Sequence, residues 1–193
     1  MTGRTALVVV DMQNGFCHPD GSWARAGYDV TPLAAVIEPC RRLVGLARRA
    51  GVPVLHTRHV HVGDFPIVAH LFPELVASGY LAPGSWDADG VDELRPAPGD
   101  PVITKTRFSA FWDTPLRALL HERGLDTVVL CGVLTGTCVD STVRDAAYAN
   151  LNAHVVADAT ADMDTATHEH ALKVIGTAFG WVTTLDAVGE QWR

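Results

Sequence analysis

The 193-residue sequence lacks an excess of basic residues, because 15 Lys and Arg side chains stand against 22 Asp and Glu, a formal net charge of −7. Nucleic acids and anionic membrane surfaces favour basic patches, so this charge argues against both as partners. The sequence also lacks a secretory leader and any apolar run near the ~18 residues that would indicate a membrane-spanning helix. We therefore expect a cytoplasmic protein that acts on a small-molecule substrate.

Cysteines are few, and they are not arranged in pairs. The sequence has four, Cys17, Cys40, Cys131 and Cys138, without the C-x-x-C spacing of zinc or thioredoxin-type sites. In a reducing compartment such cysteines are thiols rather than disulfides. Cys40 lies on an apolar helix stripe and Cys131 ends an apolar run, which favours core positions for both. Cys17 lies in a polar loop near Asp11, and its role stays open.

The chain also lacks repeats, low-complexity tracts and linkers, so we predict a single domain over residues 1–193. Short apolar runs alternate with segments of helical period, which predicts βαβ units and a parallel sheet with helices on both faces. We expect strands at 6–10, 52–57, 101–104, 127–131, 153–157 and 181–184, and helices at 31–51, 114–124, 139–147 and 165–179. The segments 17–30 and 59–99 are long for connections, which suggests lids or subunit contacts.

Three chemically reactive side chains follow predicted strands. Asp11 comes directly after the first strand, Lys105 after the third, and Cys138 one turn past the fourth. In open parallel sheets, ligands bind beyond the carboxyl ends of the strands. Each residue has an ordinary alternative: Asp11 could cap a turn, Lys105 could be a solvated lysine, and Cys138 could fill the core. Their joint placement at one edge favours catalysis.

The chemistry of these three groups is complementary. A thiolate is a nucleophile, and a cysteine at a helix N-terminus beside Lys105 has its anionic form favoured, so we expect activity to require the Cys138 thiolate. Asp11 could take the thiol proton and later deliver it to a leaving amine, while Lys105 holds the carboxylate. Backbone N–H groups near Leu134 and Cys138, in the stretch GVLTGTCVD, could bind a developing oxyanion.

Five blocks extend these observations over most of the chain: DMQNGF, PGSWDADGVDEL, KTRFSAFWDTPL, GVLTGTCVDSTVRDAAY and ADATAD. Together, in this order, they resemble the isochorismatase-like cysteine hydrolases. The resemblance implies a three-layer α/β/α sandwich with a Rossmann-like six-stranded parallel sheet, a catalytic triad of Asp11, Lys105 and Cys138, and a homo-oligomer, either dimer or tetramer. It also implies a non-proline cis peptide at Val133–Leu134, with the expected role of aiming the Leu134 N–H into the oxyanion hole.

The sequence departs from the family pattern in two places. Gly15 stands where the first block more often carries a second acid. Nicotinamidase-like members carry Asp-x-His after the second strand, whereas this chain has Thr57, His59 and His61 there, with His70 further on. A His-x-His pair could ligate zinc, because alternate residues share a face. The missing aspartate argues against it, so we predict no metal and no cofactor.

The resemblance also narrows the reaction. True isochorismatases hydrolyse a vinyl ether and lack the cysteine, so Cys138 argues against that activity. The expected reaction is attack of Cys138 on an amide or carbamoyl carbon, loss of ammonia or an amine, and hydrolysis of the thioester. The block GSWDADGVDEL is most similar to ureidoacrylate- and biuret-type enzymes, which favours a small ureido or amide compound.

Several further residues are candidates for substrate contact. Arg107 could clamp a substrate carboxylate, or it could form an ion pair with Asp113 or Asp140. The other candidates are Phe16, Trp112, Val133 and Thr137. The aromatic ones fit core positions equally well.

Three alternatives stay open at this point. The first is a metal-assisted, nicotinamidase-like amidase. The second is a non-catalytic protein of the same fold, against which the intact triad argues. The third is a redox sensor based on Cys138, for which Cys17 is the only plausible resolving thiol.

Overall fold

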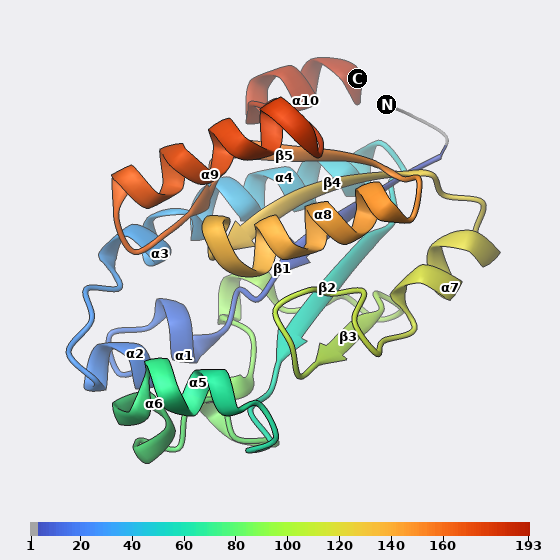
Figure 1. Ribbon diagram of the computed structural model, residues 1–193. Coiled ribbons are helices and arrows are strands. Elements are labelled where there is room, and N and C mark those ends of the chain that lie inside the picture. The colour runs from blue at the N-terminus through green and yellow to red at the C-terminus, as the bar shows by residue number, and fades with distance from the viewer. Residues whose placement is uncertain (1–3) are drawn as a thin grey trace.

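The computed structural model describes residues 4–193, so the first three residues of the predicted domain 1–193 lie outside the described range. Six parallel strands form the middle layer, in the order β3-β2-β1-β4-β5-β6 (Figure 1). This strand order is the doubly wound arrangement of Rossmann-like sheets, as predicted. The strands are β1 (Thr5–Val10), β2 (Val54–His59), β3 (Val102–Lys105), β4 (Thr127–Val133), β5 (Asn152–Ala161) and β6 (Trp181–Thr183).

Helices cover both faces of the sheet and complete the three-layer sandwich. Alternate side chains of β1 point to opposite faces. Leu7 packs with α4 (Ile37–Arg49) and α10 (Leu185–Gln191). Val8 packs in the core that holds α7 (Leu116–Glu122), α8 (Asp140–Tyr148) and α9 (Thr165–Ala178). No helix within residues 4–193 has the length and apolar character to cross a membrane. The remaining helices and helical turns are α1 (Asn14–Cys17), α2 (Ser22–Arg25), α3 (Thr31–Ala35), α5 (Pro66–Leu71), α6 (Pro73–Ala77), η1 (Trp86–Ala88), η2 (Asp92–Leu94) and η3 (Thr135–Val139).

The predicted helix at 31–51 is two helices, because the chain breaks at Val36 between α3 and α4. The break places Pro39 in the first turn of α4, where its missing N–H costs nothing, whereas a continuous helix would hold it in the interior. The second strand also starts later than the predicted 52–57. The Val52 N–H still donates to Ala47 O at the end of α4 (2.8 Å), so β2 begins only at Val54.

The long segment after β2 is folded over the carboxyl edge of the sheet and contains the short elements α5, α6, η1 and η2. The Gln13 side chain fastens it: its Nε2 donates to His59 O (2.9 Å) and Ala88 O (2.8 Å), and its Oε1 accepts from His59 N (2.8 Å). A residue of the first block therefore ties two distant parts of the chain to one edge.

The packing of the long segment also explains why glycine stands at position 15. A Cβ at this position would lie 2.6 Å from Asp87 Oδ2, so no side chain fits there. The buried Asp87 carboxylate accepts from the backbone N–H groups of Ser22 and Leu81, both at 2.8 Å. Gly15 is thus the residue that lets Asp87 anchor the segments on either side of it.

Candidate active site

The two central strands, β1 and β4, are neighbours, and the chain continues from them toward opposite edges of the sheet. Such a reversal of strand order opens a crevice at the carboxyl ends, where α/β proteins bind ligands. Asp11 directly follows β1, and Cys138 lies in η3, the turn that follows β4. Lys105 is the last residue of β3, two strands away from β1.

Lys105 brings the three predicted residues together. Its Nζ lies 2.7 Å from Asp11 Oδ2, 3.4 Å from Cys138 Sγ and 3.1 Å from the Arg107 carbonyl oxygen. The exposed fractions of Asp11, Lys105 and Cys138 are 0%, 1% and 4%. An ammonium buried this deeply requires a charged partner, and the Asp11 carboxylate is in ion-pair contact with it.

Thr57 holds the Asp11 carboxylate on its other side. The Thr57 hydroxyl donates to Asp11 Oδ1 (2.5 Å) and accepts from the Asp11 backbone N–H (3.0 Å). Asp11 has a φ of 50°, in the left-handed region that Asp tolerates better than most residues. This contact of Thr57 was not predicted, and its only signal in the sequence is the place of Thr57 near the end of the neighbouring strand.

The protonation of the site differs from the expectation drawn from the sequence. Burial raises the pKa of the Cys138 thiol to about 12, and the nearby Asp11 carboxylate acts in the same direction against the opposing effect of Lys105. The thiol is therefore protonated at rest, because the lysine does not outweigh burial, although the sequence predicted that Lys105 and the helix start favour the anionic form. That activity requires the thiolate stays a prediction. Burial lowers the pKa of Lys105, but Asp11 and Cys138 outweigh that effect and raise it, so Lys105 is an ammonium.

The turn that carries Cys138 begins with a cis peptide bond between Val133 and Leu134, at the position that the resemblance implied. In η3 the Leu134 carbonyl accepts from Thr137 N (3.2 Å) and Val139 N (3.0 Å), which makes a single π-helical turn before α8. Gly132 has a φ of 110°, and a Cβ there would collide with the Val10 carbonyl of β1. The close approach of β1 and β4 thus requires glycine at the start of the turn.

His59 lies next to the lysine, with its Nδ1 3.4 Å from Lys105 Nζ. Burial, with a further effect of Lys105, lowers the pKa of His59 to about 3, so the ring is neutral. The His61 ring contacts the Tyr80 ring, with a centroid distance of 5.9 Å, and His70 is exposed on α5. Across residues 4–193, no three His, Cys, Asp or Glu side chains are grouped so that they could hold a metal ion.

A cluster of aromatic side chains reaches His59, which lies beside Lys105. The Phe16 ring contacts Trp23 and Tyr80, with centroid distances of 5.6 Å and 6.0 Å, and Tyr80 also contacts His59 (6.1 Å). Burial raises the pKa of the Tyr80 hydroxyl, and Cys138 and Asp11 add to the shift. Tyr80 was not predicted as a residue of this cluster, because nothing in the sequence of the long loop indicates which side chain turns inward.

The other predicted contact residues have varied surroundings. Val133 is fully buried in the core, and Thr137 is half-buried in η3. Cys17, the suggested resolving thiol, is also buried in the core, and burial raises its pKa.

Arg107 forms an ion pair, but with neither predicted partner. Its guanidinium lies 3.1 Å from Asp64 Oδ1 and 4.7 Å from the centroid of the Phe65 ring. Asp140 is paired with Arg144 instead (2.6 Å). The predicted pairing with Asp113 or Asp140 was wrong, because Arg107 meets Asp64 of the segment after β2 and Asp140 is held by Arg144 within α8.

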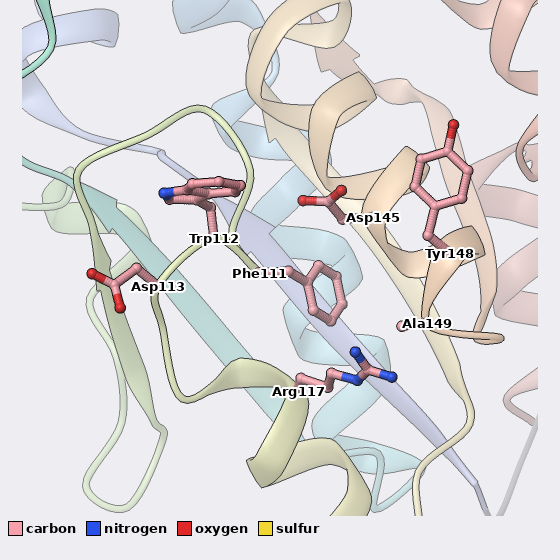
Figure 2. Close-up of a pocket in the computed structure, with 7 residues that line it drawn as sticks. All are labelled: Phe111, Trp112, Asp113, Arg117, Asp145, Tyr148 and Ala149. Atoms are coloured by element: carbon pink, nitrogen blue, oxygen red, sulfur yellow. The ribbon is translucent and has the colours of Figure 1, made fainter.

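Trp112 lies in a different, open pocket of 530 Å³ beside α8 (Figure 2). Trp112 is 63% exposed and Tyr148 is 73% exposed. None of the residues of the triad lines this pocket. The lining residues are Phe111, Trp112, Asp113, Arg117, Asp145, Tyr148 and Ala149.

The fold and the site define a class: a doubly wound α/β protein with a buried Asp-Lys-Cys cluster at the switch point of its sheet. The family model of the isochorismatase domain matches residues 5–187. The chain belongs to the isochorismatase family, a family of hydrolases.

Individual relatives are similar over nearly the whole chain. The ureidoacrylate amidohydrolase RutB of Methylobacterium radiotolerans is 38% identical, over 95% of this chain and 77% of that protein. Among solved structures, a cysteine hydrolase from Pseudomonas syringae pv. phaseolicola superposes with a TM-score of 0.87 at 30% identity, covering 98% of this chain and 92% of that one. N-carbamoylsarcosine amidase from Thermoplasma acidophilum superposes with a TM-score of 0.79 at 30% identity, covering 95% and 98%.

Proposed function

We propose that this protein is a cysteine amidohydrolase that cleaves a C–N bond of a small ureido or N-carbamoyl compound. Asp11, Lys105 and Cys138 are its catalytic residues, and the acyl group is carried as a thioester. The observation that carries the proposal is the position of Lys105 Nζ, which contacts both Asp11 Oδ2 (2.7 Å) and Cys138 Sγ (3.4 Å) in a buried site. The names of the ureidoacrylate and N-carbamoylsarcosine enzymes support the substrate class.

In the first half-reaction the Cys138 sulfur attacks the carbamoyl carbon while its proton passes to Asp11. Because the resting thiol is neutral, proton transfer accompanies attack rather than preceding it. The carbonyl oxygen becomes an oxyanion, which the backbone N–H groups of Leu134 and Cys138 bind. The C–N bond then breaks, and Asp11 returns the proton to the departing nitrogen, which leaves as ammonia or an amine.

In the second half-reaction water attacks the thioester carbon and gives its proton to Asp11. The C–S bond breaks, the acid is released, and Asp11 returns the proton to the sulfur of Cys138. Lys105 stays an ammonium throughout. It holds the Asp11 carboxylate in place and stabilises negative charge on sulfur, which a neutral side chain would not do.

The surroundings suit a small substrate. The neutral His59 ring lies beside Lys105 and packs against Tyr80, which in turn packs against Phe16. These buried rings exclude bulk water, which strengthens the electrostatic interactions inside. We retain Phe16, Val133 and Thr137 as proposed substrate contacts. Arg107 would clamp a substrate carboxylate only by exchanging it for the Asp64 carboxylate that it now binds.

The test is a panel of small ureido acids, N-carbamoyl amino acids and primary amides, with release of ammonia or amine as the signal. The proposal predicts turnover of at least one ureido or N-carbamoyl compound by the metal-free protein. The mass of the active species in solution, measured by light scattering, tests the predicted dimer or tetramer. A protein that hydrolyses no member of the panel would contradict the proposed function.

A further inference from the structure

The segment that carries Cys138 is fixed from outside the triad. Gly136 lies in the middle of η3, and its backbone N–H donates to Asp162 Oδ2 at 2.6 Å. The neighbouring Thr135 hydroxyl lies 2.8 Å from His168 Nδ1. Asp162 follows β5 and His168 belongs to α9. Residues from outside the β4–η3–α8 segment therefore hold the turn η3 in place.

The contact between the Gly136 N–H and Asp162 depends on the glycine at position 136. A Cβ at Gly136 would lie 3.1 Å from Asp162 Oδ2 and 3.3 Å from Thr167 Cγ2, so a larger residue would push the carboxylate away. The Asp162 carboxylate is only 6% exposed, and its other oxygen accepts from Met163 N (2.8 Å). Each carboxylate oxygen thus serves one N–H donor, which satisfies this buried charge.

A third side chain fixes the other end of the turn. The Thr142 hydroxyl donates to the Cys138 carbonyl (2.7 Å) and accepts from Ala110 N (3.0 Å). Cys138 therefore sits between two anchored points, Gly136 and its own carbonyl. The Leu134 and Cys138 N–H groups, which bind the oxyanion in the proposed mechanism, lie on either side of Gly136.

We propose that Asp162 is a positioning residue for the oxyanion site and that His168 assists it through Thr135. This inference rests on the proposed amidohydrolase function. Neither side chain contacts the triad; Asp162 acts by holding the Gly136 N–H, and with it the orientation of the donors at Leu134 and Cys138. A misplacement of ~1 Å in such a site can cost ~10²-fold in rate.

The chain offers a matched pair of carboxylates two residues apart. Asp164 caps the N-terminus of α9, and its two carboxylate oxygens both accept from Thr167: one from the backbone N–H (2.8 Å) and one from the hydroxyl Oγ1 (2.8 Å). Asp164→Asn retains both contacts, because a hydroxyl can accept from the new amide as readily as it donates. Asp162→Asn does not, because its two partners are both N–H donors and the amide offers only one acceptor oxygen.

The experiment compares kcat, KM and the rate of Cys138 alkylation by iodoacetamide in the parent, Asp162→Asn and Asp164→Asn. We expect Asp162→Asn to lower kcat by ~10²-fold, with KM and alkylation within about twofold, since alkylation develops no oxyanion. Asp164→Asn should match the parent in all three. His168→Phe, which keeps a ring but removes the nitrogen, should lower kcat by ~10-fold and serves if Asp162→Asn does not fold.

The outcomes separate this inference from the function on which it rests. An active parent with an equally active Asp162→Asn overturns the positioning role alone. So does an Asp162→Asn protein in which kcat and alkylation fall together with Tm, since that pattern means general loosening. A parent that hydrolyses no ureido, carbamoyl or amide compound overturns the proposed function and, with it, the catalytic meaning of the contact.

Discussion

The buried triad and the open pocket beside α8 differ in every respect that matters for chemistry. In the triad, Asp11, Lys105 and Cys138 are nearly inaccessible, and each polar group contacts another. The pocket has 530 Å³ of space, and its Trp112 and Tyr148 rings are largely exposed. A spacious cavity is easy for a ligand to enter, but reactive groups gain strength where water is excluded and partners are fixed.

Burial of the triad also has an unfavourable consequence for the nucleophile. Burial keeps the Cys138 thiol protonated, so the triad must move a proton each time the sulfur attacks. The open pocket carries Arg117, which is exposed, and Asp145, which is half-buried, on its lining (Figure 2). The following variants test whether activity belongs to the first region and not to the second.

The largest effect should come from removing the sulfur. Cys138→Ala eliminates the nucleophile, and we expect kcat to fall by at least ~10⁴-fold, with steady-state ammonia or amine release as the measurement. Cys17→Ala is the matched control, because Cys17 is another buried thiol, 1% exposed against 4% for Cys138. Equal loss of activity in both variants would remove the distinction between a reactive and a structural cysteine.

Asp11→Asn should have the next largest effect. It removes the proton acceptor and should lower kcat by ~10²–10⁴-fold. It also leaves the buried Lys105 ammonium unpaired, which should cost ~3–5 kcal/mol in urea unfolding. Asp186→Asn, at an exposed carboxylate, should change neither measurement. Full activity in Asp11→Asn would show that another group receives the proton.

The pH dependence of alkylation tests the protonation of the site. Because the pKa of Cys138 is raised from 9.0 to about 12, its thiolate fraction at pH 9 is lower than that of a free thiol by roughly two to three orders of magnitude. The iodoacetamide rate at Cys138, followed by peptide mass, should rise about tenfold per pH unit up to pH 10 without a plateau. A plateau near or below pH 9 would show that Lys105 does outweigh burial.

The smallest effect is expected in the open pocket. Tyr148→Ala removes one of its exposed aromatic walls, and we expect kcat/KM for the best ureido or carbamoyl substrate to stay within about twofold, since the exposed ring contacts no residue of the triad. A loss of tenfold or more would mean that this pocket, or a subunit contact at it, serves the reaction. In that case activity would depend on both regions, and not on the triad alone.

Much of the fold was predictable, because runs of apolar residues in the sequence indicate where the buried strands end. The apolar runs before Asp11 and Cys138 indicated buried parallel strands, and the parallel sheet brings their carboxyl ends to one edge. The resemblance added the strand count and the position of the cis peptide at Val133–Leu134, both of which the structure confirms.

The remaining features depend on contacts between distant segments, which periodicity does not encode. Thr57 meets Asp11 across two strands, Arg107 meets Asp64 across a folded loop, and Asp162 meets Gly136 across the turn. The protonation of Cys138 was predicted in the wrong direction for the same reason. Local sequence shows a lysine and a helix start, but the depth of burial is a property of the whole fold.

The most direct test of the central claim is to trap the covalent intermediate. The parent protein is mixed with its best ureido or carbamoyl substrate, quenched in acid within one turnover, digested and analysed by mass spectrometry. We predict that the peptide containing Cys138 gains the mass of the acyl or carbamoyl group, and that the same adduct is missing from Cys138→Ala. Turnover with no adduct on Cys138 at any quench time, or with activity retained in Cys138→Ala, would contradict the account.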